Sequence, residues 1–320
     1  MAARQMSTRT GFEPSFQGVI MAGGKGSRLA PLTDDEAQKA ALLPVGNRAL
    51  ISYQLDFLQR AGVTDVIVVT SAAAAALIER AAEQHPTMRV SVEVAADDVM
   101  GTADALRQIQ PKLCASPAPP APLRRSSPCA PVHSYTDFCV MSCDLLTEVP
   151  LGTVLDTHRA HGGALTALMV QQPPADDQKK KVKTEDFVVL DEDTGALLMV
   201  AQKAELEETL DMRRTLVEKY QRVSVRGDLH DVHCYVLAHW VLGLLQAKTE
   251  FRSIKAELLP YLLRKQYAMS AADRALFPPA AAAAAHPQHL ALGMSSAVRP
   301  PAPPKPRSRN RQVAQNTSSL

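Results

Sequence analysis

The residues best suited to chemistry form a glycine-rich loop near the start of the chain. An apolar run, Val19 to Ala22, leads directly into Gly23-Gly24-Lys25-Gly26-Ser27-Arg28. Three glycines among four positions let the backbone turn tightly and bring its N–H groups close to an anion. The arginine adds a permanently charged, planar fork that suits phosphate oxygens. The sequence therefore predicts a phosphate-binding loop, formed by Gly23, Gly24, Gly26, Ser27 and Arg28.

This loop does not follow the two most common phosphate-binding patterns. The loop of GTPases requires G-x-x-x-x-G-K-[ST], and the dinucleotide fingerprint requires G-x-G-x-x-G. Residues 23–33 instead resemble the G-G-x-G-[ST]-R-L-x-P-L-T signature of the sugar nucleotidyltransferases. The alternative interpretation is a structural glycine turn with an incidental arginine.

Two later segments resemble further parts of that family's site. They are Gly101-Thr102-Ala103, which matches G-T-A, and Ser142-Cys143-Asp144, which matches [GS]-x-D. The resemblance implies that Gly101 and Thr102 lie against a nucleotide base and that Asp144 holds Mg²⁺. Asp144 also follows a predicted buried strand, where ligands meet parallel sheets, and its oxygens suit Mg²⁺. The simpler alternatives are a helix start at Thr102 and a turn cap at Asp144.

Three departures from the family pattern weaken the case for catalysis. The P-K-P segment is replaced by Gln38-Lys39-Ala40-Ala41-Leu42-Leu43-Pro44, so its lysine is displaced and both flanking prolines are missing. The E-K-P segment is not recognisable, and Asp231 and Asp228 are only weak candidates for a second metal carboxylate. We therefore predict no working catalytic group, with Arg28 and Lys39 as vestigial candidates.

Hydrophobic periodicity predicts an α/β protein that contains a strand–helix–strand unit. The three ordered motifs resemble those of the sugar nucleotidyltransferases, and this resemblance implies a Rossmann-like nucleotidyltransferase fold, in which helices cover both faces of a mixed, mostly parallel sheet. The expected strands span residues 19–22, 65–70, 89–94, 137–142, 164–170, 186–190, 197–200 and 229–237. The first expected helix carries Ile51, Leu55 and Leu58 on one buried stripe, and another begins at Gly101. Further helices are expected over residues 72–78, 149–161, 203–220, 239–246 and 254–267.

Composition divides the chain into one domain and three irregular segments. We expect residues 1–15 to be a disordered lead-in and 16–268 to form the domain, with a Pro-rich insertion at 114–134. Residues 269–320 are rich in alanine, proline and arginine, which predicts a disordered tail.

Charge and cysteine usage exclude several classes of protein. The net charge is only +2, and all charged residues after Asp273 are basic, so the domain itself is mildly acidic. This argues against a nucleic-acid-binding surface on the domain. The five cysteines form no C-x-x-C pair or secretory framework, and no apolar stretch is long enough to span a membrane. These features predict a cytosolic protein without membrane contact. A metal site at His230 and His233 is disfavoured, since they would point to opposite faces of a regular strand.

Stretches outside the shared motifs resemble one branch of the family, the gamma subunits of eukaryotic translation initiation factor 2B. The similar segments are 100–107, 140–146, 222–237 and 254–266, and Ser142-Cys143-Asp144 has the form typical of that branch. The resemblance implies a non-catalytic subunit that pairs with the epsilon subunit, within a complex that promotes GDP/GTP exchange on initiation factor 2.

It also implies that no cofactor is required, with Mg²⁺ and GTP or another nucleotide left open as ligands. Gamma subunits continue into a β-helix of hexapeptide repeats. No such period follows Tyr267, so we expect a truncated form. The alternative function is an active mannose- or glucose-1-phosphate nucleotidyltransferase.

Overall fold

The computed structural model describes residues 16–24, 26, 29–33, 40–96, 101–114, 137–171, 186–202, 209–266, 277 and 294–295. Several predicted features lie outside these residues, namely the N-terminal lead-in, Ser27, Arg28, Lys39, residues 115–134 of the Pro-rich insertion and most of the tail.

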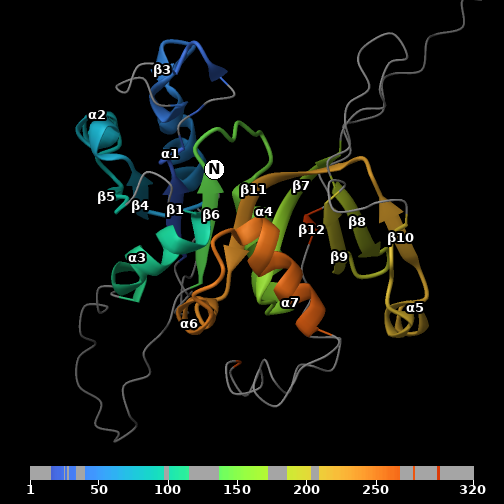
Figure 1. The fold of residues 1–320 in the computed structure, drawn as a ribbon. Coiled ribbons are helices and arrows are strands. Elements are labelled where there is room, and N and C mark those ends of the chain that lie inside the picture. Colours follow the sequence, from blue (N-terminus) through green and yellow to red (C-terminus); the bar gives the residue numbers. More distant parts are fainter. Residues whose placement is uncertain are drawn as a thin grey trace, which may run out of the picture.

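A seven-stranded mixed sheet forms the centre of the molecule, with strand order β12-β7-β11-β6-β1-β4-β5 (Figure 1). The strands β1, β4, β5 and β6 run parallel to one another, whereas β11 runs antiparallel between β6 and β7. Their bounds are β1 Gln17–Met21, β4 Asp65–Thr70, β5 Arg89–Val94, β6 Phe138–Ser142, β7 Leu165–Gln171, β11 Leu229–Leu237 and β12 Met294–Ser295. The predicted mostly parallel mixed sheet is confirmed.

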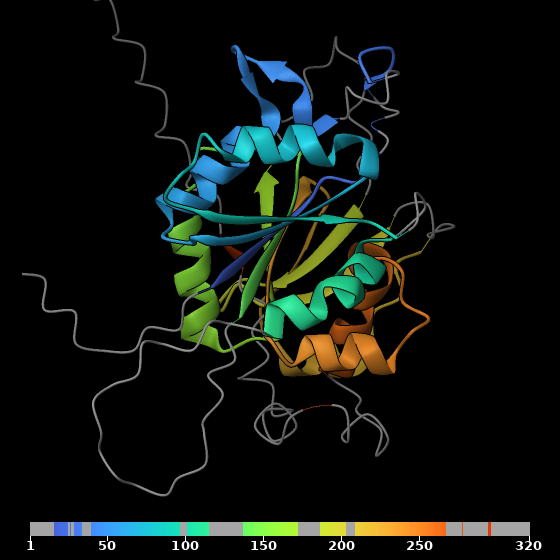
Figure 2. The same cartoon turned by 90° about the vertical axis from the view of Figure 1, so that its left-hand side faces the viewer.

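Helices cover both faces of this sheet, as Figure 2 shows. Successive side chains of a strand point to opposite faces, and neighbours on β1 illustrate this. Ile20 packs in a buried cluster with α1 Leu50–Arg60, α2 Ala72–Ala82 and α4 Leu151–His161. Val19 packs with the opposite layer, which consists of α3 Thr102–Cys114, α6 Val241–Ala247, the π-helical turn η4 Ile254–Leu258 and α7 Leu259–Lys265. The two apolar clusters make a core of the kind expected for a doubly covered sheet.

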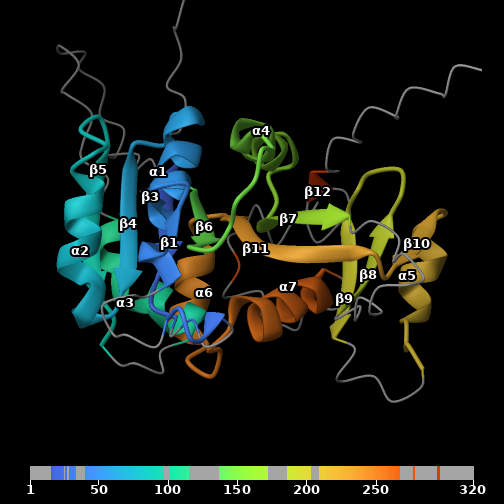
Figure 3. The same ribbon diagram turned by 90° about the horizontal axis from the view of Figure 1, so that it is seen from above.

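A second, smaller sheet lies at the end of the molecule away from β5 (Figure 3). Its antiparallel order is β10-β8-β9, with β8 Asp186–Asp191, β9 Leu197–Gln202 and β10 Val223–Arg226. The predicted hairpin of β8 and β9 is confirmed by their pairing. The short helix α5 Arg214–Lys219 buries Leu216 against Val189 and Leu198 of this sheet. A two-stranded ribbon, β2 Pro44–Val45 and β3 Arg48–Ala49, follows the 3-10 turn η2 Ala40–Leu42.

The structure corrects two predicted elements. The expected helix over residues 203–220 is wrong for 209–213 and for Tyr220, because among its described residues only Arg214–Lys219 is helical. The segment predicted as one helix from Ile254 begins as a π-helical turn and becomes α-helical at Leu259. Strand β10 was not expected at all.

Two short pieces of the predicted disordered tail are among the described residues. Phe277 is buried beside Trp240, with ring centroids 4.9 Å apart, and Met294–Ser295 pairs with β7. In the part of the chain that the structure describes, no helix is long and apolar enough to cross a membrane.

Candidate functional site

The described part of the glycine loop leaves the carboxyl end of β1. A Cβ added at Gly23 or Gly24 would meet no atom within 4 Å, so the backbone is open on that side. Gly26 has a φ of 66°, in the left-handed region that favours glycine. Its carbonyl accepts hydrogen bonds from the Thr33 hydroxyl and the Leu29 N–H, both at 2.7 Å. In the described part of the loop, Gly26 is therefore held by Leu29 and Thr33, and there is room beside the backbone of Gly23 and Gly24.

Asp144 lies at the same edge of the sheet as this loop. Met21 and Ser142 are paired at the ends of the adjacent parallel strands β1 and β6, and the Cys143 N–H donates to the Met21 carbonyl at 3.2 Å. The Ser142 hydroxyl donates to the Asp144 carboxylate. The glycine loop and the carboxylate thus leave neighbouring strands side by side, at the edge where α/β sheets hold ligands.

A cavity of about 300 Å³ opens beside Asp144. Its polar lining includes Thr102, Ser142, Asp144, His233, Tyr235 and Lys255. These side chains come from α3, from β6 and the turn that follows it, from β11 and from η4, so separate parts of the chain converge on one space. The cavity is of the size that holds small ligands.

The Gly101-Thr102-Ala103 segment at this cavity is held tightly against another part of the chain. A Cβ at Gly101 would lie 2.2 Å from the backbone oxygen of Arg252. The Ala103 N–H donates to that oxygen at 2.9 Å, and the Ile254 N–H donates to the Thr102 hydroxyl at 2.9 Å. Helix α3 does begin at Thr102, as the simpler alternative had it, but the Thr102 hydroxyl accepts from the neighbouring segment that leads into η4. Glycine is required at position 101 because its backbone approaches the backbone of Arg252 closely.

Strand β11 is irregular where it borders the cavity. A bulge separates Asp231 from Cys234, and His233 has a φ of 54°. The Asp231 carboxylate stabilises this turn, because it accepts from the His233 N–H at 2.9 Å and from the Tyr235 hydroxyl. Our assumption that His230 and His233 alternate on a regular strand is therefore wrong. Burial, with the charge of Asp231, strongly raises the pKa of Tyr235, so its hydroxyl remains a donor.

Neither weak candidate for a second metal carboxylate lines the cavity. Both oxygens of Asp231 are used within the bulge, and Asp228 is paired with Arg226 at 2.6 Å. Among the described residues, Asp144 is the one acidic side chain that lines the cavity. The same residues contain no group of three or more histidine, cysteine or acidic side chains arranged to hold a metal ion. One carboxylate fits Mg²⁺ that is held jointly with ligand phosphates, which is a usual arrangement for this ion.

The principal cation at the cavity is Lys255, which we did not identify from the sequence. Its ammonium lies 2.7 Å from the Asp186 carboxylate, and both side chains are largely buried. This pair joins η4 to β8 of the small sheet. The sequence offered no pattern that links positions 186 and 255, since Lys255 appears only as a polar position of an amphipathic helix.

Three comparisons place the chain among known proteins. A family model described as nucleotidyl transferase matches residues 17–179. The gamma subunit of translation initiation factor eIF2B from Schizosaccharomyces pombe is 29% identical over 80% of this chain and 52% of its own length. The same subunit from Dictyostelium discoideum is 29% identical over 90% of this chain and 65% of its own length. The chain thus spans about half to two thirds of these relatives.

A solved structure supports the fold. A Bacillus anthracis protein described as a glucose-1-phosphate thymidylyltransferase superposes with a TM-score of 0.54 over 78% of this chain and 84% of its own, at 16% sequence identity. This likeness concerns the fold alone, and it agrees with the Rossmann-like architecture predicted from the motifs.

Proposed function

The chain belongs to the nucleotidyl transferase family, and from this premise we propose that it acts as a non-catalytic subunit of an initiation factor 2B complex. The complex would promote the exchange of GDP for GTP on initiation factor 2. The observation that carries the proposal is the similarity to gamma subunits over 80% and 90% of the chain.

The chemistry of the cavity supports a non-catalytic role. Nucleotidyl transfer depends on cations and metal-bound carboxylates that neutralise developing phosphate charge. Among the described residues, Asp144 is the acidic side chain that lines the space, and the nearby ammonium of Lys255 is paired with Asp186. Such a site suits ligand retention better than nucleotidyl transfer.

We further propose that the glycine loop and Asp144 retain affinity for GTP with Mg²⁺. The phosphates would lie over Gly23, Gly24, Gly26, Ser27 and Arg28, with the base near Gly101 and Thr102. Isothermal titration calorimetry with GTP and Mg²⁺ tests this. We expect binding that Arg28→Ala weakens at least tenfold, whereas equal affinity of the variant would remove the loop from the site.

The proposed partners are the epsilon subunit and the remaining subunits of the complex, with initiation factor 2 engaged through them in the cytosol. Co-expression of this chain with an epsilon subunit, followed by affinity capture, tests the assembly. We expect stoichiometric recovery of epsilon. Its absence from the captured material, while the chain itself remains folded by circular dichroism, would reject the proposal.

An active sugar-1-phosphate nucleotidyltransferase is the second candidate. It is favoured by one observation, the position of the glycine loop and Asp144 at the ends of adjacent strands. Release of pyrophosphate from GTP or UTP with mannose 1-phosphate or glucose 1-phosphate would establish it. The activity should then disappear in Asp144→Asn and persist in Asp228→Asn, since Asp228 is paired outside the cavity.

A further inference from the structure

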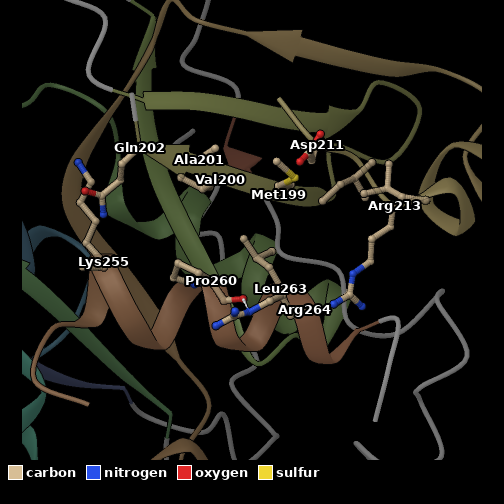
Figure 4. Close-up of a pocket in the computed structure, with 13 residues that line it drawn as sticks. Met199, Val200, Ala201, Gln202, Asp211, Arg213, Lys255, Pro260, Leu263 and Arg264 are labelled. Carbon is tan, nitrogen blue, oxygen red and sulfur yellow. Dashed lines mark hydrogen bonds between the residues drawn. The ribbon is translucent and has the colours of Figure 1, made fainter. Parts of the chain in front are cut away.

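A second cavity, of about 480 Å³, lies along β9 of the small sheet (Figure 4). Residues 198–202 of β9 form one side of it. The turn from η4 into α7 and the segment 211–216 form its other two sides. We call this space the β9 groove. Lys255 borders both this groove and the cavity beside Asp144, but the remaining lining residues differ.

The groove follows the edge of β9. Val200 packs toward the main core, whereas Met199 packs toward the small cluster around Leu198 and Leu216, so the two side chains point to opposite faces of the strand. A space that touches both of them runs along the strand's edge, since beyond the register shift at Leu198 consecutive side chains alternate between faces.

That edge of β9 carries no neighbouring strand among the described residues. β9 pairs with β8 on its other side, and the order β10-β8-β9 leaves β9 at the end of the sheet. Within the same residues, no backbone–backbone hydrogen bond joins positions 198–202 to the segment 209–216. An open strand edge is a template for pairing with another extended chain.

The walls of the groove combine an apolar surface with positive charge. Leu198, Leu216 and Leu263 are each almost fully buried beneath it, and Pro260 adds to the apolar wall on α7. Arg213 and Arg264 are exposed and contribute guanidinium groups from two different walls. Figure 4 shows Arg213 extending toward α7, where Arg264 lies. The lining contains one acidic side chain, Asp211, against these two arginines and the paired Lys255.

We propose that the β9 groove binds an extended, acidic peptide segment of a partner protein, which adds to β9 as a further strand. The edge of β9 opposite β8 supplies the main-chain hydrogen bonds, and the two arginines select glutamate or aspartate at the groove's open side. Aliphatic side chains of the peptide would alternate with the acidic ones and face Leu216 or Leu263. Five paired residues span about 16 Å at the strand rise. This inference does not rest on the proposed function.

Selection from a displayed library of random eight-residue peptides, with the full chain immobilised, tests the ligand chemistry. We expect enrichment of peptides with acidic residues at alternate positions. Enrichment of basic peptides, or none above background, would overturn the proposal.

A selected peptide then tests the binding mode. We expect its affinity to fall at least tenfold in the double variant Arg213→Glu/Arg264→Glu and to be unchanged in Arg214→Glu, whose arginine is exposed and pairs with Glu218. Methylation of alternate peptide nitrogens, in both registers, should abolish binding in one register, because a strand offers every second N–H to its neighbour.

Hydrogen exchange localises the contact. The peptide should slow exchange of amides within residues 198–202. Protection elsewhere with none in β9, equal binding of both methylated peptides, or displacement of the peptide by mannose 1-phosphate would each reject strand addition in the β9 groove.

Discussion

The packing of Gly101 against the backbone of Arg252 makes a sharp prediction for Gly101→Ala. The new methyl group would lie 2.2 Å from the Arg252 oxygen and 2.8 Å from its carbonyl carbon. Both neighbours are backbone atoms, so no side-chain rotation relieves the clash. The start of α3 and the segment that leads into η4 must move apart.

The size of the effect follows from what this separation disturbs. Overpacking at a well-packed position costs roughly 1–3 kcal/mol. The hydrogen bonds of Ala103 to Arg252 and of Ile254 to Thr102 would also stretch, at about 1 kcal/mol each. We therefore expect the free energy of unfolding to fall by about 3–5 kcal/mol.

Urea denaturation followed by circular dichroism measures this change. Gly152→Ala in α4 is the matched control, because a Cβ there meets no atom within 4 Å. It should leave the stability unchanged or raise it by up to about 1 kcal/mol. A loss below about 1 kcal/mol for Gly101→Ala would refute the argument that this glycine is required for contact between the two backbones.

Three further predictions concern charged and buried side chains of the domain. The Arg107 side chain donates to the carbonyls of Leu245, Lys248 and Phe251, each at 2.6 Å. Arg107→Ala should therefore lower the free energy of unfolding, measured by urea denaturation, by about 3 kcal/mol. The control Arg89→Ala, which removes an exposed arginine, should lower it by less than about 1 kcal/mol. The Arg226 guanidinium lowers the pKa of Asp228 to about 2. The pair therefore stabilises the fold fully at pH values above the ordinary aspartate pKa, and this stabilisation is lost as the pH falls toward 2. An NMR titration of the Asp228 carboxyl measures the pKa, and a midpoint near 4 would contradict the lowered value. Burial, with a smaller effect of the Asp144 charge, raises the pKa of the Cys143 thiol to about 12. Iodoacetamide at pH 8 should therefore label this thiol only when urea unfolds the chain. Rapid labelling of the native chain would show that the thiol is exposed.

Elements that bury a periodic apolar face could be predicted from the sequence. The Asp65–Thr70 strand and the α1 stripe of Ile51, Leu55 and Leu58 are confirmed, because their patterns and their burial arise from the same core. Residues 209–213 lack such a face, and alternation also failed at His233, where a bulge depends on the contact between Asp231 and Tyr235. Lys255 was missed for a similar reason. Its partner Asp186 is brought near only by the packing of the small sheet against η4.

The family motifs in this chain serve the fold as well as any ligand. Gly26 is required by its positive φ, and Gly101 by its contact with Arg252. Both requirements would remain if no phosphate ever bound, because each comes from the chain's own backbone. A lysine that contacts only a nucleotide has no such structural requirement, and the segment around Lys39 is where the sequence departs from the family pattern. A glycine signature is therefore evidence for this architecture, whereas evidence for nucleotidyl transfer must come from the side chains that touch the ligand.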